Sequence, residues 1–227
     1  MAFGVIHTNS VVEVRHRPRP RHTARDAVVV CVFGNTAHWA SIWNDWAETP
    51  AEHADVCISV RTSDLEQAVY VQGTLDGPHT HHDDLTGSDV CHTDLVLDGV
   101  LPALLQVAQE TRWVIHGASG GCVTAVSLAR LLYGLGHEVL GVVADCGVPG
   151  AGDPLPQSIP CSIFRSTFDR FWVADGHEMI YEIWKASGYN VDFEGYGHDR
   201  HAWVVNAARL EYVLRYIEGA HGLRILQ

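Results

Sequence analysis

Residues 112–132, RWVIHGASGGCVTAVSLARLL, constrain the fold more than any other part of this sequence. The segment RWVIH (112–116), apolar over Trp113–Ile115, leads into five small residues, 117–121, and apolar residues at helical spacing follow over 121–133. This change of period predicts a strand, a sharp turn and a helix. A serine, Ser119, stands at the centre of that turn.

The same alternation of strand and helix patterns runs along most of the chain, which implies an α/β fold with a mostly parallel central β-sheet and helices on both faces. Residues 3–14 supply one or two edge strands. We expect further strands at 27–33, 54–60, 112–116, 138–144, 161–166 and 189–194, and helices at 93–110, 121–133, 174–187 and 202–218. Ligand chemistry in such sheets collects at the C-terminal ends of the strands.

The 227 residues are best explained as one domain with a sizeable core. Within it, residues 1–26 hold the edge strands and an Arg/Pro connector, and residues 61–93 form a histidine-rich excursion. The net charge of −12 argues against nucleic acid as a partner. The Arg/Pro stretch 15–25 carries five of the fifteen basic residues, and a solvated connector explains it better than a docking arm.

Nothing in the sequence resembles a secretory signal or an apolar span of the ~20 residues that cross a bilayer. We therefore expect a cytoplasmic protein whose six cysteines are reduced thiols. The oligomeric state cannot be predicted from this sequence.

The turn GASGG (117–121) fits the pattern G-x-S-x-G. A nucleophile at a strand-to-helix reversal sits in strained backbone, and glycine at 117 and 121 removes side chains that would collide across the turn. The helix start directs free N–H groups at a developing oxyanion. The plainer alternative is a tightly packed glycine turn without chemistry. A nucleotide site is disfavoured, because neither G-x-G-x-x-G nor a P-loop lysine is present.

In its order of motifs, the chain from about residue 27 onward resembles the α/β-hydrolase fold superfamily of serine hydrolases, especially esterase and dienelactone-hydrolase-like members without a large cap domain. The resemblance implies that Ser119 is the nucleophile, with an acid after a later strand and a histidine after the last. The stretch CSIFRSTFDRFW (161–172) points to Asp169 as the acid. The G-x-G-H turn in NVDFEGYGHDRHAW (190–203) points to His198 as the base.

Each assignment has a competitor. Asp145 directly follows the predicted strand 138–144, where some members of the superfamily carry the acid, and His201 lies three residues beyond His198. The motif matches favour Asp169 and His198.

The resemblance also implies an oxyanion hole and a pocket. Its backbone donors would be the N–H groups of Gly120 and of Asn35, which lies in the loop FGNTAHW (33–39). Phe33 stands where many members carry histidine. Phe168 and Trp172 flank the proposed acid and are candidates to line the substrate pocket.

The loop GPHTHHDDLTGSDVCHTD (77–94) is the second cluster of chemistry-bearing residues. Its segment 79–84 resembles the H-x-H-x-D-H signature of metallo-β-lactamase-type hydrolases, with Asp84 in place of the last histidine. His79, His81, His82 and Asp83 could bind zinc. The order of elements around the loop is that of serine hydrolases, so we favour a polar excursion beside the active site and expect no metal or other cofactor.

The sequence therefore predicts a serine hydrolase that cleaves small or short-chain carboxylic esters through an acyl-serine intermediate, with a small-molecule ester as its partner. Two alternatives remain: a metal-dependent hydrolase that uses the cluster His79–Asp84, and a non-catalytic binding protein of the same fold. The acyl and alcohol specificity cannot be read from the sequence, and neither can the choice among esterase, thioesterase, lipase and amidase.

Overall fold

The structure is a computed structural model. It describes residues 4–8, 12–17, 27–33, 55–60, 100–106, 112–118, 121–145, 155–166, 174–188, 191–196, 214–219, 222 and 224. Among these residues no helix has both the length and the apolar character needed to cross a membrane.

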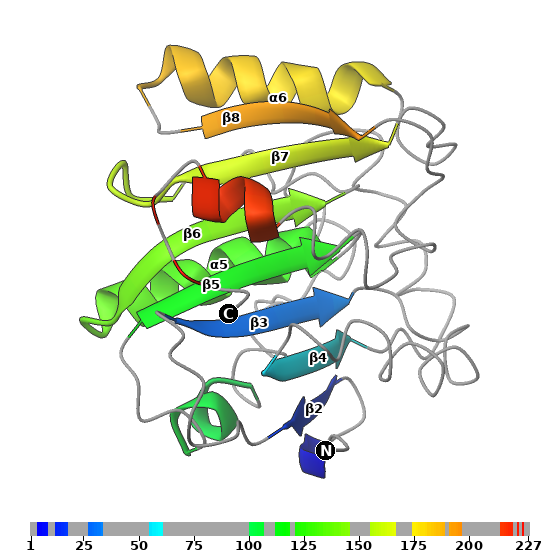
Figure 1. Cartoon of the computed structure of the whole chain (residues 1–227), viewed down its shortest axis with the longest axis vertical. Coiled ribbons are helices and arrows are strands. Elements are labelled where there is room, and N and C mark those ends of the chain that lie inside the picture. The colour runs from blue at the N-terminus through cyan, green and yellow to red at the C-terminus, as the bar shows by residue number, and fades with distance from the viewer. Residues whose placement is uncertain are drawn as a thin grey trace, which may run out of the picture.

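In the described part of the chain, eight strands form one sheet in the order β1-β2-β4-β3-β5-β6-β7-β8 (Figure 1). The edge strands β1 and β2 pair antiparallel, as do β2 and β4, and all other neighbours pair parallel. The predicted α/β class with a mostly parallel sheet is confirmed. The strands are β1 (Gly4–Thr8), β2 (Val12–His16), β3 (Val28–Phe33), β4 (Val56–Val60), β5 (Arg112–Ala118), β6 (Glu138–Asp145), β7 (Cys161–Ser166) and β8 (Val191–Tyr196).

Helices lie on both faces of this sheet. Helix α5 (Gly121–Gly134) crosses behind β5 and β6, whereas the helical residues 214–219 lie in front of the sheet (Figure 1). Helix α6 (Ala174–Ala186) packs along β7 and β8 at one end of the sheet. Residues 100–106 are also helical, within the predicted helix 93–110.

The core follows from the alternation of side chains along each strand. On the face toward α5, Trp113 and Ile115 of β5 join buried residues of the helix, such as Leu128, in one apolar cluster. On the opposite face Phe164 of β7 makes an edge-to-face contact with Tyr216, with ring centroids 5.3 Å apart. The strands buried on both sides are continuous apolar runs, as parallel strands covered by helices are expected to be.

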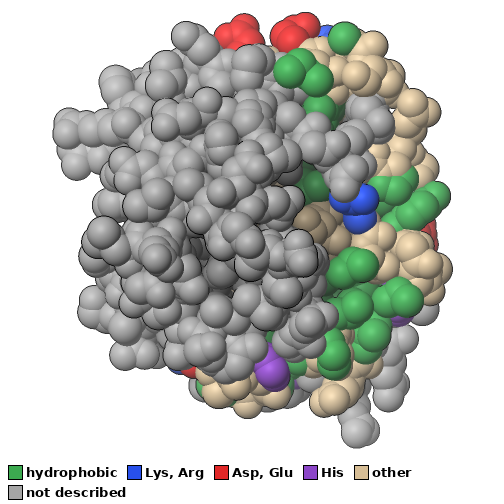
Figure 2. Space-filling view, turned by 180° about the vertical axis from the view of Figure 1, so that it is seen from behind, with side chains coloured by type: hydrophobic (Ala, Val, Ile, Leu, Met, Phe, Trp, Pro, Cys, Tyr) green, Lys and Arg blue, Asp and Glu red, His purple; other side chains and the backbone are tan. Residues whose placement is uncertain are grey.

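The exposed side of α5 is not wholly polar. Hydrophobic side chains gather on the part of the rear face that the structure describes (Figure 2). Leu131 and Tyr133 near the end of α5, and Leu135 just after it, are among the exposed apolar residues of the chain. The helix is thus packed against the sheet on one side without being strongly amphipathic.

Several strand ends differ from the sequence prediction by one or two residues, and strand pairing explains the C-terminal ends of β2, β5 and β8. β2 continues to His16 because Arg15 and His16 pair with Cys57 and Val56 of β4, so the first residues of the predicted Arg/Pro connector are strand. β5 continues to Ala118 because it pairs with β3 on one side and β6 on the other. β8 spans 191–196 instead of 189–194, since its pairing with β7 runs on through Tyr196.

The described cysteines are Cys31, Cys57, Cys122 and Cys161, and all four are buried and form no disulfide with one another. The prediction that the cysteines are reduced thiols stays a prediction, and the burial of these four agrees with it. Burial raises the pKa of the Cys57 thiol to about 12, which leaves it protonated and unreactive at neutral pH.

Candidate active site

The predicted strand–turn–helix is present. β5 ends at Ala118 and α5 begins at Gly121, so the chain reverses from strand to helix across residues 119 and 120. Ser119 and Gly120 themselves lie outside the described residues. Both flanking glycines, Gly117 and Gly121, are described, and Gly117 shows why the turn requires a residue without a side chain at its start.

Gly117 lies where strand and helix come closest. A Cβ atom added there would stand 2.7 Å from the Cα of Cys122, 2.7 Å from the Gly121 carbonyl oxygen and 2.8 Å from the Cβ of Ala125. These distances are far inside van der Waals contact, and two of the three atoms belong to the backbone. Any side chain at 117 would therefore push the start of α5 away from the end of β5.

We expect Gly117→Ala to lower the free energy of unfolding by about 1–3 kcal/mol or more, since the added methyl group overpacks a site lined by backbone. Chemical denaturation followed by circular dichroism measures this change. Gly134→Ala is the matched control: it lies at the other end of α5, with nothing within 4 Å of an added Cβ. It should be neutral or slightly stabilising. Equal losses in the two variants would contradict the tight approach at Gly117.

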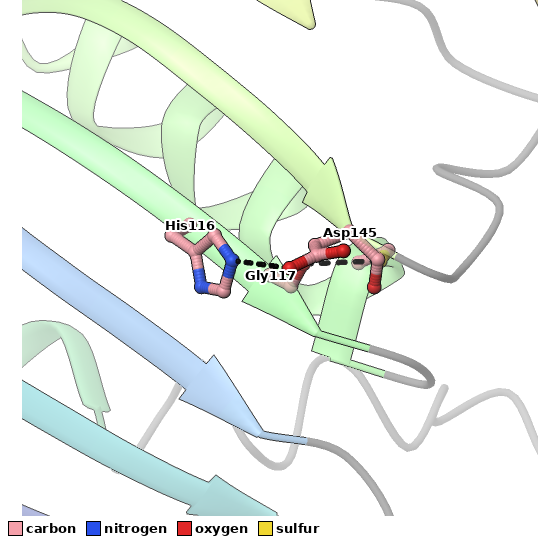
Figure 3. Close-up of polar contacts among 4 residues, drawn as sticks. His116, Gly117 and Asp145 are labelled. Carbon is pink, nitrogen blue, oxygen red and sulfur yellow. Dashed lines mark hydrogen bonds and ion pairs between the residues drawn. The ribbon is translucent and has the colours of Figure 1, made fainter. Parts of the chain in front are cut away.

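A buried polar pair lies beside this turn, on the face opposite to α5. The Nε2 atom of His116 is 3.1 Å from Oδ2 of Asp145, and neither side chain has any exposed surface (Figure 3). His116 comes from β5, and Asp145 is the last residue of β6. In the sheet Asp145 is the register partner of Ala118, which directly precedes Ser119. The carboxylate that the sequence offers as the alternative acid is thus next to the turn.

A third side chain reaches both strands from α5. The Cys122 thiol lies 3.3 Å from the carbonyl oxygen of Gly117 and 3.7 Å from that of Asp145, so its single S–H proton is within reach of both acceptors. Because Cys122 is in the first turn of α5, it ties the start of the helix to the ends of β5 and β6. Contacts on both faces of the sheet therefore hold the strand ends beside the turn: Cys122 on the face toward α5, and the pair of His116 and Asp145 on the opposite face.

The neighbour of His116 on the β3 side is a cysteine. Cys31 is the register partner of His116 across the β3–β5 ladder. Burial raises the pKa of the Cys31 thiol well above its ordinary value, and the nearby groups Cys57, Asp55 and Asp145 raise it further. Cys31 is therefore a neutral neighbour of the pair at physiological pH.

The other predicted site residues lie outside the described part of the chain. They are the acid Asp169, the base His198 with its competitor His201, the oxyanion donor Asn35, the pocket residues Phe168 and Trp172, and the cluster of His79, His81, His82 and Asp83. Their strands are described. Asn35, Asp169 and His198 follow the ends of β3, β7 and β8 by two, three and two positions. Parallel strands end at one edge of a sheet, so these three sequence positions follow strand ends on the same edge as the turn.

Within the described ranges, no three histidine, cysteine or carboxylate side chains are grouped so that they could hold a metal ion. The loop 77–94 lies outside those ranges, so the proposed zinc cluster stays untested.

Sequence reasoning missed His116. The only signal was a histidine inside an apolar run, at a position whose side chain points to the face opposite Trp113 and Ile115. That signal does not identify a partner, because the pairing with Asp145 depends on the register between β5 and β6.

The sequence matches no known protein-family model and no curated protein. Solved structures match it over nearly its whole length. The Bacillus cereus carboxylesterase superposes with a TM-score of 0.55 at 14% identity, covering 93% of this chain and 96% of that one. A dienelactone hydrolase-like promiscuous phosphotriesterase from metagenomic libraries gives 0.54 at 14% identity, covering 100% and 91%.

The Pyrococcus horikoshii acylaminoacyl peptidase gives a TM-score of 0.56 at 12% identity; it covers all of this chain, which spans 43% of the peptidase. Together with the strand order and the turn after β5, these matches establish that the chain has the α/β-hydrolase fold.

Proposed function

We propose that this protein is a serine hydrolase that cleaves carboxylic esters through an acyl-serine intermediate on Ser119. The observation that carries the proposal is the close approach of Gly117 to the start of α5, which leaves no room for a side chain two residues before Ser119, as the G-x-S-x-G pattern of a nucleophile elbow requires. The turn follows the C-terminal end of a central parallel strand, where this fold collects its chemistry.

In the proposed mechanism His198 removes the proton of the Ser119 hydroxyl as its oxygen attacks the ester carbonyl, and Asp169 orients the imidazole. The negative charge on the tetrahedral oxygen is stabilised by the N–H groups of Gly120 and Asn35. His198 then gives its proton to the departing alcohol, which leaves the acyl group on Ser119. Water, deprotonated by the same histidine, attacks this acyl-enzyme and releases the carboxylic acid and free serine.

The substrate class is proposed from the lengths of the segments between the predicted elements and from the names of the structural neighbours. Between the predicted elements only the segments 61–93 and 147–160 are long enough to shape a pocket, and neither is long enough for a separate cap domain. This favours small or short-chain esters that reach an open site, with Phe168 and Trp172 as its lining. The names of the structural neighbours, among them a carboxylesterase and an esterase, agree with ester cleavage.

A fluorophosphonate probe tests the proposal, because it reacts covalently with activated serines. Labelled protein would be digested and the modified peptide identified by mass spectrometry. We expect one label, on Ser119, which is lost when His198 is replaced by alanine. Absence of labelling in well-folded protein, with no turnover of esters, would overturn the proposal in favour of a fold retained for binding alone.

Chelation separates this mechanism from its metal-dependent rival. Because the proposed reaction uses no metal, we expect EDTA followed by gel filtration to leave the rate of p-nitrophenyl acetate hydrolysis unchanged. The rate is measured at 400 nm before and after treatment, with about the same enzyme concentration. Two results together would instead assign the reaction to the cluster of His79, His81, His82 and Asp83. EDTA would abolish an activity that added zinc restores, and the Ser119→Ala variant would keep the activity of the wild type.

A further inference from the structure

The buried pair of His116 and Asp145 has no part in the mechanism above, yet it lies directly beside the turn that the mechanism uses. Both side chains are completely buried, and the distance of 3.1 Å between Nε2 and Oδ2 is that of a hydrogen bond. A buried carboxylate is costly unless donors satisfy it. We therefore ask which part of the structure the buried Asp145 carboxylate stabilises.

The register of the sheet shows that the contact is diagonal. His116 is the partner of Val143 in β6, and Asp145 is the partner of Ala118 in β5. The imidazole therefore reaches forward along the sheet, toward the C-terminal edge, to bind the carboxylate beside the last residue before Ser119 (Figure 3). A contact in this direction links the end of β5 to the end of β6 where the ladder of backbone hydrogen bonds stops.

The second nitrogen of the imidazole ring identifies which partner donates in this hydrogen bond. Nδ1 of His116 is buried and has no hydrogen-bond partner among the residues that the structure describes. A proton on that atom would be an unpaired buried donor, which costs about 1–3 kcal/mol. The tautomer with its proton on Nε2 avoids this cost and donates to Asp145. His116 is thus a donor to the carboxylate.

Asp145 is held from the other face as well, because the Cys122 thiol reaches its carbonyl oxygen and that of Gly117. One residue at the end of β6 is therefore bound by β5 through its side chain and by α5 through its backbone. These are the two elements that flank Ser119.

We propose that His116 is a positioning residue for the nucleophile turn: its bond to Asp145 fixes the end of β5 against β6 and so sets the place of Ser119. This inference rests on the proposed function for its effect on turnover, but its structural part can be measured without it. A misplacement of about 1 Å at a reacting group can cost a factor of about 100 in rate.

Two amide variants test it as a matched pair. The amide nitrogen of glutamine is the same number of bonds from Cα as Nε2 of histidine, so His116→Gln keeps a donor for Asp145. The amide nitrogen of asparagine corresponds to Nδ1, so His116→Asn leaves the carboxylate without that donor. We expect His116→Asn to lower kcat for p-nitrophenyl acetate by about 10- to 100-fold with little change in KM, and His116→Gln to regain most of the rate.

Val143→Ala is the control for lost packing, because Val143 is buried and is the register partner of His116 but takes no part in the bond. It should lower stability while leaving kcat near that of the wild type. If His116→Asn does not fold, His116→Met, which fills the space and donates nothing, takes its place.

Amide hydrogen exchange, followed by mass spectrometry on the peptide that spans 112–125, provides the readout that does not need turnover. Faster exchange in His116→Asn, reversed in His116→Gln and absent in Val143→Ala, supports the proposal. Equal exchange and equal kcat in the two amide variants overturn it, and so does a loss in Val143→Ala as large as that in His116→Asn. If wild-type Ser119 does not react with a fluorophosphonate, the proposed function fails and the exchange data alone decide the positioning role.

Discussion

Replacing Ser119 with alanine is expected to lower kcat for p-nitrophenyl acetate by about 10⁵- to 10⁶-fold, to the small rate that binding and the oxyanion hole alone supply. The reason is chemical: without the hydroxyl no acyl-enzyme forms, and water must attack the ester directly. Alanine is smaller than serine, so Ser119→Ala adds no atoms to a turn that is already close-packed at Gly117. The free energy of unfolding should therefore change little.

Steady-state kinetics with active-site titration measures this loss, and denaturation checks that the variant is folded. His198→Ala is expected to cost about as much as Ser119→Ala, and the double variant no more than either alone, because nucleophile and base act as one unit. Additive losses would show that the two residues act in separate steps. A rate in Ser119→Ala close to that of the wild type would remove Ser119 from the mechanism.

The architecture was predictable because its signals are local. Runs such as AVVVCVF (27–33) are apolar on every residue, which is typical of a parallel strand covered on both faces, and the helical spacing after residue 121 is equally plain. Strand ends were less predictable. Ala118 and Tyr196 belong to strands because their neighbours in the sheet pair with them, and that information is not contained in the segment itself.

In the candidate site, too, the local features were predictable and the features that depend on strand pairing were not. The need for glycine at 117 was readable from the pattern of the turn, since the reason for it lies within a few residues of chain. The bond between His116 and Asp145 was not readable, because the two residues are 29 positions apart and meet only through the register of β5 with β6. A histidine in an apolar strand predicts a buried polar group with a partner, but the sequence does not say which partner.

This pair changes how the two candidate acids should be compared. The sequence presented Asp169 and Asp145 as rivals for one role. In the structure one carboxylate oxygen of Asp145 is bound by His116, and the residue stands beside Ala118. A carboxylate in this position can support the turn whether or not it also orients a catalytic histidine. The question is then which of the two aspartates, when neutralised, removes the function of a triad acid.

We expect Asp169→Asn to lower kcat by about 10⁴-fold without loss of stability, as is typical when a triad acid can no longer fix the tautomer of its histidine. Asp145→Asn should lower kcat by only about 10- to 100-fold, through displacement of the turn. It should also cost about 1 kcal/mol of stability, because the buried bond from His116 would then reach a neutral amide oxygen instead of a carboxylate.

Both variants are compared by kcat, by the rate of fluorophosphonate labelling at Ser119 and by denaturant unfolding. The labelling rate is informative because it needs the nucleophile and its base but no deacylation. The reverse pattern, with a loss of about 10⁴-fold in Asp145→Asn and a small one in Asp169→Asn, would make Asp145 the acid of the triad. His116 would then hold the acid itself, and the positioning role inferred for it would act on the charge-bearing member of the triad instead of on the turn alone.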